Sequence, residues 1–417
     1  MPDRSTRKSP EKIGPKRAGD GSRRRSAALR AGGAALYKEP ETGCGLAAVF
    51  MRFLCVVGTR PEAIKLAPVI LELAQHAQVT TVCSGQHGKL VSEPLAWFGI
   101  TPDERIAVAA KSRSLAKLTA AMLVPLERML TKHRPDVVIA QGDTNTVLVA
   151  ALAAFYADIP FAHVEAGLRT GNLRAPFPEE FNRIAADRLA RWHFCPTRRA
   201  VANLRAERIE GAGIHLTGNT GIDALRLALA RLAPAPPGER GRRRILLTAH
   251  RRENQGSRME AICRAVVGLV REFPDIEFVI PVHPSPAVRA TFERLRVAHD
   301  RVRLLPPLSY PRLVAELRDA HLIVTDSGGI QEEAPFLKKP VLVLRDVTER
   351  PEAVELGVAR LVGTETAAIA AAVRELLTDP AAYAKMAAGG SPYGDGYAAQ
   401  RISAAFGLGR RSASAVG

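Results

Sequence analysis

The chain has 417 residues, of which 47% are apolar, enough for two domains of ordinary size with a core each. Its formal net charge of +17 raises the question of a nucleic-acid partner, but residues 1–50 alone hold eleven Lys and Arg against five Asp and Glu. The remaining excess is spread along the chain, and aromatic residues make up only 5%. The composition favours anionic small-molecule substrates over nucleic acid. No apolar run reaches the roughly 20 residues of a membrane-spanning helix.

Residues 1–50 and the cysteines indicate where the folded part begins and in which compartment it works. Residues 1–50 lack apolar periodicity and combine Pro, Gly, Ser and charge, so we expect a disordered basic extension without a secretory signal. Since Met51 begins the first strand, a wrongly assigned start codon is an alternative. The five cysteines are Cys44, Cys55, Cys83, Cys195 and Cys263. They form no C-x-x-C pair, which indicates reduced thiols, a cytoplasmic location and no zinc site.

Short apolar runs alternate with longer helical patterns from Met51 onward. Helices are predicted at 61–75 and 114–130. Near-continuous apolar runs between amphipathic segments are typical of buried parallel strands, so the fold class is α/β. The predicted strands are "RFLCVV" (52–57), "VTTVC" (79–83), "DVVIA" (136–140), "PFAHV" (160–164), "RRILLTA" (243–249), "IEFVIPV" (276–282), "RVRLL" (301–305), "HLIVT" (321–325) and "VLVLR" (341–345).

A composition break at "ALARLAPAPPGERGRRR" (228–244) divides these strands about evenly and indicates an interdomain linker. We therefore expect two similar doubly wound domains that face each other across a cleft. The predicted parts are a first domain (51–219), a second domain (220–390), a terminal helix (391–408) and a flexible tail (409–417). The periodicity of the sequence leaves open whether the terminal helix packs back on the first domain or on the second.

Polar clusters follow seven of the predicted strands, at the ends where parallel α/β sheets bind ligands. In "GTRPEAIK", Pro61 opens a helix whose positive end, with Arg60 and Lys65, forms a predicted anion site. "QGDTNT" contributes Asp143, either as a reacting acid or as a turn or helix cap. "HVEAGLRTGNLRAPFPEEFNR" contributes Glu165 and Glu179.

The clusters of the second half are typical of a nucleotide site. "DSGGIQEE" places Ser327, Gly328 and Gly329 before a helix, where backbone N–H groups can receive a phosphate, and Glu333 is a candidate acceptor for ribose hydroxyls. "HRREN" adds His250 and Arg251 after another strand, and "HPSP" adds His283.

The common cofactor motifs are absent. The sequence has no G-x-G-x-x-G after the first strand, no P-loop and no H-E-x-x-H. We therefore expect no nicotinamide cofactor and no metal, with basic side chains neutralising a diphosphate instead.

Seven motifs together resemble the non-hydrolysing UDP-N-acetylglucosamine 2-epimerases. They span Met51 to about Phe406 in the family's order: "GTRPEAIK", "QGDTNT", "HVEAGLRTG", "PFPEEFNR", "TAHRREN", "DSGGIQEE" and "TERPEAVELG". The resemblance implies a GT-B-like pair of Rossmann-type domains in a cytoplasmic homodimer. It also implies interconversion of UDP-GlcNAc and UDP-ManNAc for surface polysaccharides.

The resemblance also implies roles for individual residues. Asp143, Glu165 and Glu179 match the family's acids and bases, and Arg60, Lys65 and His250 match residues that position or stabilise the leaving UDP. Ser327, Gly328, Gly329 and Glu333 match its UDP-binding turn, assisted by Arg251. This agrees with the chemistry, because inversion at C2 without a nicotinamide requires elimination of UDP, with cations on the diphosphate and carboxylates to move the proton.

Two questions stay open at the level of sequence. The family's "QHR" reads "QHG" here, so Gln86 and His87 lie in the region of its second, activating substrate site without the Arg. The rival functions are epimerisation of another UDP-amino sugar, such as a diacetamido uronic acid, glycosyl transfer by a GT-B enzyme, and nucleotide-sugar sensing without catalysis.

Overall fold

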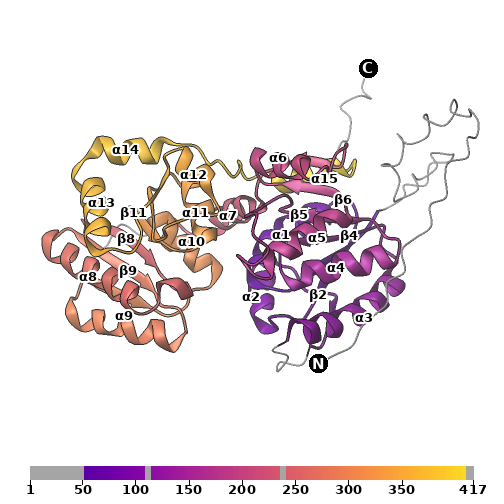
Figure 1. Ribbon diagram of the computed structural model, residues 1–417, viewed down its shortest axis with the longest axis horizontal. Coiled ribbons are helices and arrows are strands. Elements are labelled where there is room, and N and C mark those ends of the chain that lie inside the picture. The colour runs from indigo at the N-terminus through magenta and orange to yellow at the C-terminus, as the bar shows by residue number, and fades with distance from the viewer. Residues whose placement is uncertain (1–50, 109–113, 235–240, 410–417) are drawn as a thin grey trace, which may run out of the picture. The chain divides into compact units, whose positions relative to one another are not determined.

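A computed structural model describes residues 51–108, 114–234 and 241–409 (Figure 1). The expectations for residues 1–50 and 410–417 lie outside the described residues. The first sheet has seven strands in the order β3-β2-β1-β4-β5-β6-β7, and the second has six in the order β10-β9-β8-β11-β12-β13. All neighbouring strands in both sheets are parallel. The predicted α/β class is confirmed.

The nine predicted strands are all present, and four others join them. The predicted ones are β1 (Arg52–Val57), β2 (Gln78–Cys83), β4 (Val137–Gln141), β5 (Phe161–Val164), β8 (Arg243–Thr248), β9 (Ile276–Pro281), β10 (Val302–Leu305), β11 (Leu322–Thr325) and β12 (Val341–Val343). The sequence did not predict β3 (Glu104–Arg105), β6 (Ala190–Cys195), β7 (Ile214–Leu216) or β13 (Ala359–Leu361). Three of these are short and the fourth, "ARWHFC", begins with polar and bulky residues, so each lacks a long apolar run.

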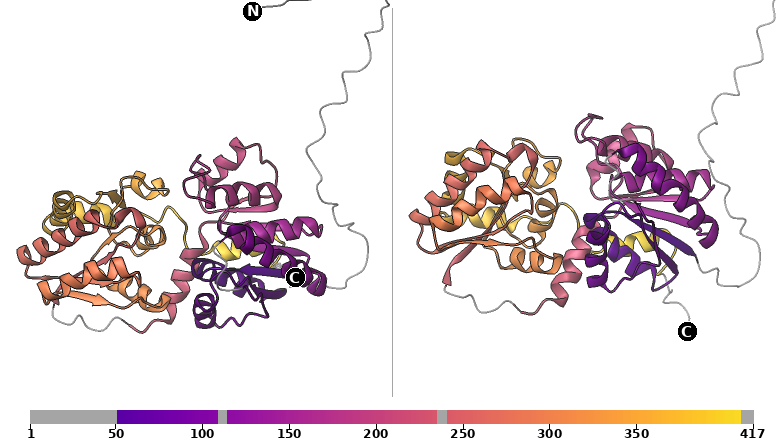
Figure 2. Two further views of the ribbon diagram at one scale, coloured as in Figure 1. Left: turned by 60° about the horizontal axis from the view of Figure 1, so that its bottom comes forward. Right: turned by 90° about the horizontal axis from the view of Figure 1, so that it is seen from below.

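Helices cover both faces of each sheet (Figures 1 and 2). Those linked to the first sheet are α1 (Arg60–Leu73), α2 (Lys89–Phe98), α3 (Leu115–His133), α4 (Asn145–Tyr156), α5 (Glu179–Leu189) and α6 (Arg198–Ala206). From α7 (Thr220–Arg231) the chain continues through α8 (Ser257–Glu272), α9 (Pro286–Ala298), α10 (Tyr310–Asp319), α11 (Gly328–Phe336), α12 (Pro351–Glu355), α13 (Thr366–Thr378), α14 (Pro380–Ala388) and α15 (Ala398–Ala405). Among the described residues no helix is long and apolar enough to cross a bilayer.

The terminal helix packs on the first sheet. Buried Ala399 and Ile402 of α15 belong to the same apolar core as β1 and α1. The Phe406 ring lies 5.0 Å from the rings of Phe53 and Trp192, measured between centroids. The chain therefore passes from the first sheet to the second through α7 and returns after α14.

The strand order of each sheet reverses at its centre, between β1 and β4 in the first sheet and between β8 and β11 in the second. The loops beyond the carboxyl ends of such strand pairs diverge to opposite faces of the sheet and leave a crevice there. The polar clusters of the sequence leave both sheets at these ends, which places the candidate site.

Candidate active site

Glu165 leaves β5 in the left-handed region of backbone conformation, with φ of 72°. Few residues other than glycine adopt this conformation, which carries strain and is concentrated at functional sites. Its Oε2 accepts hydrogen bonds from Lys65 Nζ at 2.7 Å and from Gln141 Nε2 at 2.6 Å. The turn thus aims the carboxylate at a cation of α1 and an amide of β4.

Lys65 connects the two halves of the chain. Its Nζ lies 2.7 Å from Glu165 of the first sheet and 3.0 Å from Glu332 Oε2 of α11. Burial lowers the pKa of Lys65, but the two carboxylates outweigh burial and the net direction is upward. The ammonium group is therefore charged and held between two nearly buried acids.

Glu332 and Arg350 complete this network, although the sequence predicts neither as a site residue. Arg350 Nε donates to Glu332 Oε1 at 2.6 Å, and Asn219 Nδ2 donates to Oε2 at 2.8 Å. Burial raises the pKa of Glu332, but Arg350 and Lys65 bring it down to about 2. Both residues lie in motifs of the sequence, "DSGGIQEE" and "TERPE", but the sequence does not indicate which of the two adjacent acids of the helix enters the site.

Asp143 faces an arginine rather than capping a helix. Arg183 donates to its Oδ2 from Nε at 2.9 Å and from Nη2 at 2.7 Å, while Thr144 is the N-cap of α4. Arg183 Nη1 also donates to Glu180 Oε2 at 3.0 Å, and Glu180 Oε1 accepts from the N–H groups of Thr170 and Gly171 at 2.9 Å each. Glu180 therefore holds the loop, and Arg183 joins the loop to Asp143.

Glu179 differs from its neighbour Glu180. It is the first residue of α5, and its Oε2 is buried without a hydrogen-bond partner among the described residues. A buried carboxylate oxygen without a donor is costly unless another molecule supplies the donor. Among the three predicted acids, Glu179 alone has a buried carboxylate oxygen without a hydrogen-bond partner in the described part of the chain.

Glu62 is a further buried acid, located in the "GTRPE" turn. It accepts from the N–H groups of Gly58 at 2.5 Å and Thr59 at 3.0 Å, and from the Thr144 hydroxyl. Burial raises the pKa of Glu62 to about 7 despite these donors. The carboxylate joins the start of α1 to the turn after Asp143, which identifies it as a structural element of the site.

The predicted nucleotide residues lie at the carboxyl ends of the second sheet. The backbone N–H groups of His250 and Arg251 donate to Asp326 Oδ2 at 2.8 and 2.9 Å, and the rings of His250 and His283 stack at 5.5 Å. Burial lowers the pKa of His250. The structure thus gathers His250, Arg251 and His283 around the end of β8.

Arg350 packs closely against the turn before α11. Ser327 is the N-cap, and the following Gly328 leaves space that a side chain would take from Arg350, because a Cβ there would lie 2.6 Å from Arg350 Cζ. Glu333 points into the helix packing, where Tyr310 Oη donates to its Oε1 at 3.3 Å. Burial, reinforced by the charge of Glu332, raises the pKa of Glu333 to about 8.

Arg60 and Gln86 have protein partners, and His87 is exposed. Arg60 Nη2 donates to the carbonyl of Leu308, before α10, at 2.6 Å, while its buried Nε has no partner among the described atoms. Gln86 Oε1 accepts from Thr146 Oγ1 at 2.7 Å. Binding of a second substrate molecule beside Gln86 and His87 stays a prediction.

Some of these groups line two adjoining cavities. The smaller, about 40 Å³, is lined by Asp143, Glu165, Arg183, Glu332 and Arg350 among others. The larger, about 490 Å³, shares Arg169, Thr197, Glu349 and Glu352 with it and adds Arg251 and Arg345. Arg345 Nη1 is buried and unpartnered among the described atoms. Two of the three predicted acids, Asp143 and Glu165, and the predicted cation Arg251 therefore line adjoining cavities, whereas Glu179 lines neither.

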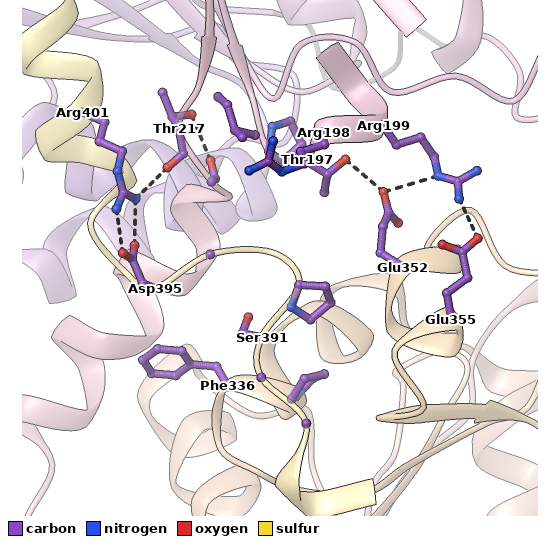
Figure 3. Close-up of a pocket in the computed structure, with 18 of the residues that line it drawn as sticks. Thr197, Arg198, Arg199, Thr217, Phe336, Glu352, Glu355, Ser391, Asp395 and Arg401 are labelled. Atoms are coloured by element: carbon purple, nitrogen blue, oxygen red, sulfur yellow. Dashed lines mark hydrogen bonds and ion pairs between the residues drawn. The ribbon is translucent and has the colours of Figure 1, made fainter. Parts of the chain in front are cut away.

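A third hollow of about 960 Å³ holds none of the predicted residues (Figure 3). The charged side chains labelled around it largely pair with each other: Arg199 Nη2 lies 2.6 Å from Glu355 Oε1, and Arg401 Nη2 lies 2.6 Å from Asp395 Oδ2. No group of three or more His, Cys, Asp or Glu that could bind a metal occurs in the described part of the chain.

Comparison with known proteins identifies the family. A model of the family described as UDP-N-acetylglucosamine 2-epimerase matches residues 70–407. The chain belongs to this family. It is 44% identical to the UDP-N-acetylglucosamine 2-epimerase of Bacillus subtilis, over 84% of this chain and 94% of that protein. Identity to the Escherichia coli K12 enzyme of the same name is 43%, over 84% and 97%.

A solved structure gives the same result for the fold. The crystal structure of UDP-GlcNAc 2-epimerase from Neisseria meningitidis bound to UDP-GlcNAc superposes with a TM-score of 0.80 at 42% identity. The superposition covers 85% of this chain and 99% of the Neisseria meningitidis chain. The chain is thus an epimerase, and its GT-B-like pair of parallel-sheet domains is confirmed.

Proposed function

We propose that this epimerase interconverts UDP-GlcNAc and UDP-ManNAc by eliminating and re-adding UDP, and supplies ManNAc for surface polysaccharides. The observation that carries the proposal is the shared lining of the two adjoining cavities. Asp143 and Glu165 line the smaller one, and Arg251 lines the larger. Acids that can move a proton thus lie beside cations that can bind a diphosphate.

The elimination begins with loss of the C2 proton to a carboxylate. The electron pair of the C2–H bond forms a C1–C2 double bond, the C1–O bond breaks, and UDP leaves with the electron pair of the C1–O bond. A 2-acetamidoglucal-type intermediate results. Return of a proton to the opposite face of C2, with re-addition of UDP, gives the epimer. Asp143, Glu165 and Glu179 are the proposed acids and bases, and the proposal assigns the proton to no single one of them.

The proposed nucleotide site uses the second sheet. The N–H groups after Ser327, the cation Arg251 and, once it takes up a proton, His250 bind the diphosphate, as helix N-termini and arginines do at other anion sites. Glu333, whose Oε1 accepts from Tyr310 in the free protein, is the proposed ribose ligand. Lys65 and Arg60 complete the charge balance from the first sheet. Such preorganised cations stabilise the charge that develops on the leaving UDP.

An experiment in heavy water tests the proposal. The protein is incubated with UDP-GlcNAc in D₂O without nicotinamide or a sugar acceptor, and the products are examined by NMR spectroscopy. Deuterium at C2 together with UDP-ManNAc supports the proposal. Transfer of the sugar only when an acceptor is added would indicate a glycosyltransferase instead, and exchange only with a diacetamido uronic acid nucleotide would indicate the other epimerase.

We also propose that the enzyme works as a cytoplasmic homodimer. Large apolar side chains are exposed on α3 and α4, which pack against each other: Leu115, Val124, Phe155 and Tyr156 are 40 to 68% exposed. Exposed apolar side chains on neighbouring helices are candidates for a subunit interface. Light scattering after size-exclusion chromatography tests this, and a monomer at micromolar concentration would contradict it.

A further inference from the structure

A buried histidine and aspartate lie directly beneath the two turns that carry Asp143 and Glu165. His163 of β5 and Asp187 of α5 are both inaccessible to solvent at their side chains. His163 Nδ1 lies 2.6 Å from Asp187 Oδ1, and His163 Nε2 lies 2.7 Å from the carbonyl oxygen of Gly142. Neither residue is among the acids, bases and UDP ligands proposed above.

The hydrogen-bond geometry determines the protons of this ring. The Gly142 carbonyl can only accept, so Nε2 carries a hydrogen. Asp187 Oδ2 lies 2.8 Å from the cationic Arg169 Nη2 and accepts from the Gly167 N–H at 3.1 Å, and both contacts favour the ionised carboxylate. An ionised carboxylate also only accepts, and Nδ1 therefore carries a second hydrogen. His163 is thus an imidazolium in the interior.

The charges around the ring support this state. Burial lowers the pKa of His163, but the charge of Asp187 and its hydrogen bond outweigh burial, and the net direction is upward. Burial raises the pKa of Asp187, but His163 and Arg169 bring it down to about 2. Arg169 opposes the charge of His163 but is itself paired with Glu207, Nε to Oε1, at 2.6 Å.

His193 of β6 provides an internal contrast. Its Nε2 donates to the carbonyl of Asp187 at 2.8 Å, and its Nδ1 is buried without a partner among the described atoms. Burial lowers the pKa of His193. One ring beside Asp187 therefore carries two hydrogens and the other carries one.

The pair is connected to both catalytic turns. His163 binds the carbonyl of Gly142, the residue before Asp143, and Asp187 binds the N–H of Gly167, two residues after Glu165. We propose that His163, held as a buried imidazolium by Asp187, is a positioning residue that fixes the Asp143 and Glu165 turns for proton transfer. The roles of Asp143 and Glu165 in this statement rest on the proposed function.

The protonation state is tested first, on the intact protein and without any activity. Nitrogen-15 NMR of protein labelled at histidine is recorded at about pH 8, above the ordinary histidine pKa of about 6.5. The expected result is one ring with hydrogens on both nitrogens, whose signals change in the Asp187→Asn variant. If all rings carry a single hydrogen at this pH, the proposal is overturned.

The Asp187→Asn variant then tests the role in the reaction. The introduced amide retains the shape of the carboxylate, can accept from Gly167 and Arg169 through its oxygen, and can donate to a neutral His163, which keeps its bond to Gly142. Because charge-assisted hydrogen bonds are roughly twice as strong as neutral ones, we expect kcat to fall about tenfold with KM and the Kd for UDP within about twofold. Unchanged kcat, or a change confined to KM, would overturn the proposal.

Asp395→Asn is the matched control. It also neutralises an acid paired with an arginine, Arg401, but this pair is exposed and Asp395 lines neither cavity of the candidate site. Its kcat stays at the wild-type value. The two parts of the experiment fail separately: an inactive wild-type protein would contradict the proposed function, whereas the nitrogen-15 spectrum reports on His163 regardless of turnover.

Discussion

Lys65 of α1 and Glu332 of α11 form an ion pair of 3.0 Å between the two halves of the chain, and the same ammonium group contacts Glu165 at 2.7 Å. The side chains are 5 to 13% exposed. A proposed acid of the first domain is therefore linked through one cation to the helix that begins the proposed UDP site. Substitutions in this network should affect stability as well as turnover.

Removing the cation should destabilise the fold. In Lys65→Met, Glu165 and Glu332 lose their shared partner, and breaking a buried pair from one side costs about 3 to 5 kcal/mol. Urea denaturation measures the change. Lys132→Met is the control, because Lys132 pairs with Glu104 at the surface, and it should change stability little. Equal stability of Lys65→Met and the wild type would show that the buried pair is uncoupled from folding.

Glu179 and Glu180 should separate chemistry from structure. Glu179→Gln should abolish deuterium exchange at C2 while UDP binding, measured by calorimetry, stays within about twofold, because the unpartnered Oε2 contributes no hydrogen bond to the fold. Wild-type exchange in this variant would exclude Glu179 from the reaction.

Glu180→Gln should instead act on stability. Its carboxylate accepts from two backbone N–H groups and from Arg183, and an amide nitrogen would face the guanidinium group. We expect a loss of about 1 to 3 kcal/mol in free energy of unfolding. Unaltered stability would contradict the assignment of Glu180 to the loop rather than to the reaction.

The pKa of Glu333 predicts a pH dependence of stability. Burial raises this pKa from 4.5 to about 8, so the folded chain holds the proton more tightly and the stabilising contribution of Glu333 falls as pH rises between these values. Glu333→Gln should remove that loss, becoming more stable than the wild type by up to roughly 5 kcal/mol above pH 8 and by much less near pH 5. Denaturation of both proteins at several pH values, without ligand, measures the difference. A difference independent of pH would refute the prediction.

His250 should take up a proton when UDP binds. Its pKa is lowered by burial in the free protein, and a bound diphosphate raises it again, so the affinity for UDP falls as pH rises through the pKa of the complex. Calorimetry in buffers of different ionisation enthalpy measures the proton uptake at about pH 7. His250→Gln should bind UDP more weakly and without that uptake. An uptake of the same size in the variant would assign the proton to another group.

Much of the architecture was predictable from the sequence, because buried parallel strands form continuous apolar runs. All nine predicted strands are present, whereas β6 was missed because "ARWHFC" begins with polar and bulky residues. The motifs also placed Asp143, Glu165 and Arg251 at strand ends, and the structure finds them along adjoining cavities. Parallel strands carry their following loops to the same edge of a sheet, so order along the chain was enough for this.

Which charged side chains meet depends on how the whole chain folds. Lys65 and Glu332 are far apart in the sequence, and Glu332 and Glu333 are neighbours with opposite fates. Glu332 faces Lys65 and Arg350, whereas Glu333 faces Tyr310, and their pKa values shift to about 2 and about 8. Successive residues of a helix point in different directions, and burial and partners then determine their charge. Motifs and apolar runs were thus enough to predict the family and the strand ends of the site, whereas packing sets the charge state of each acid.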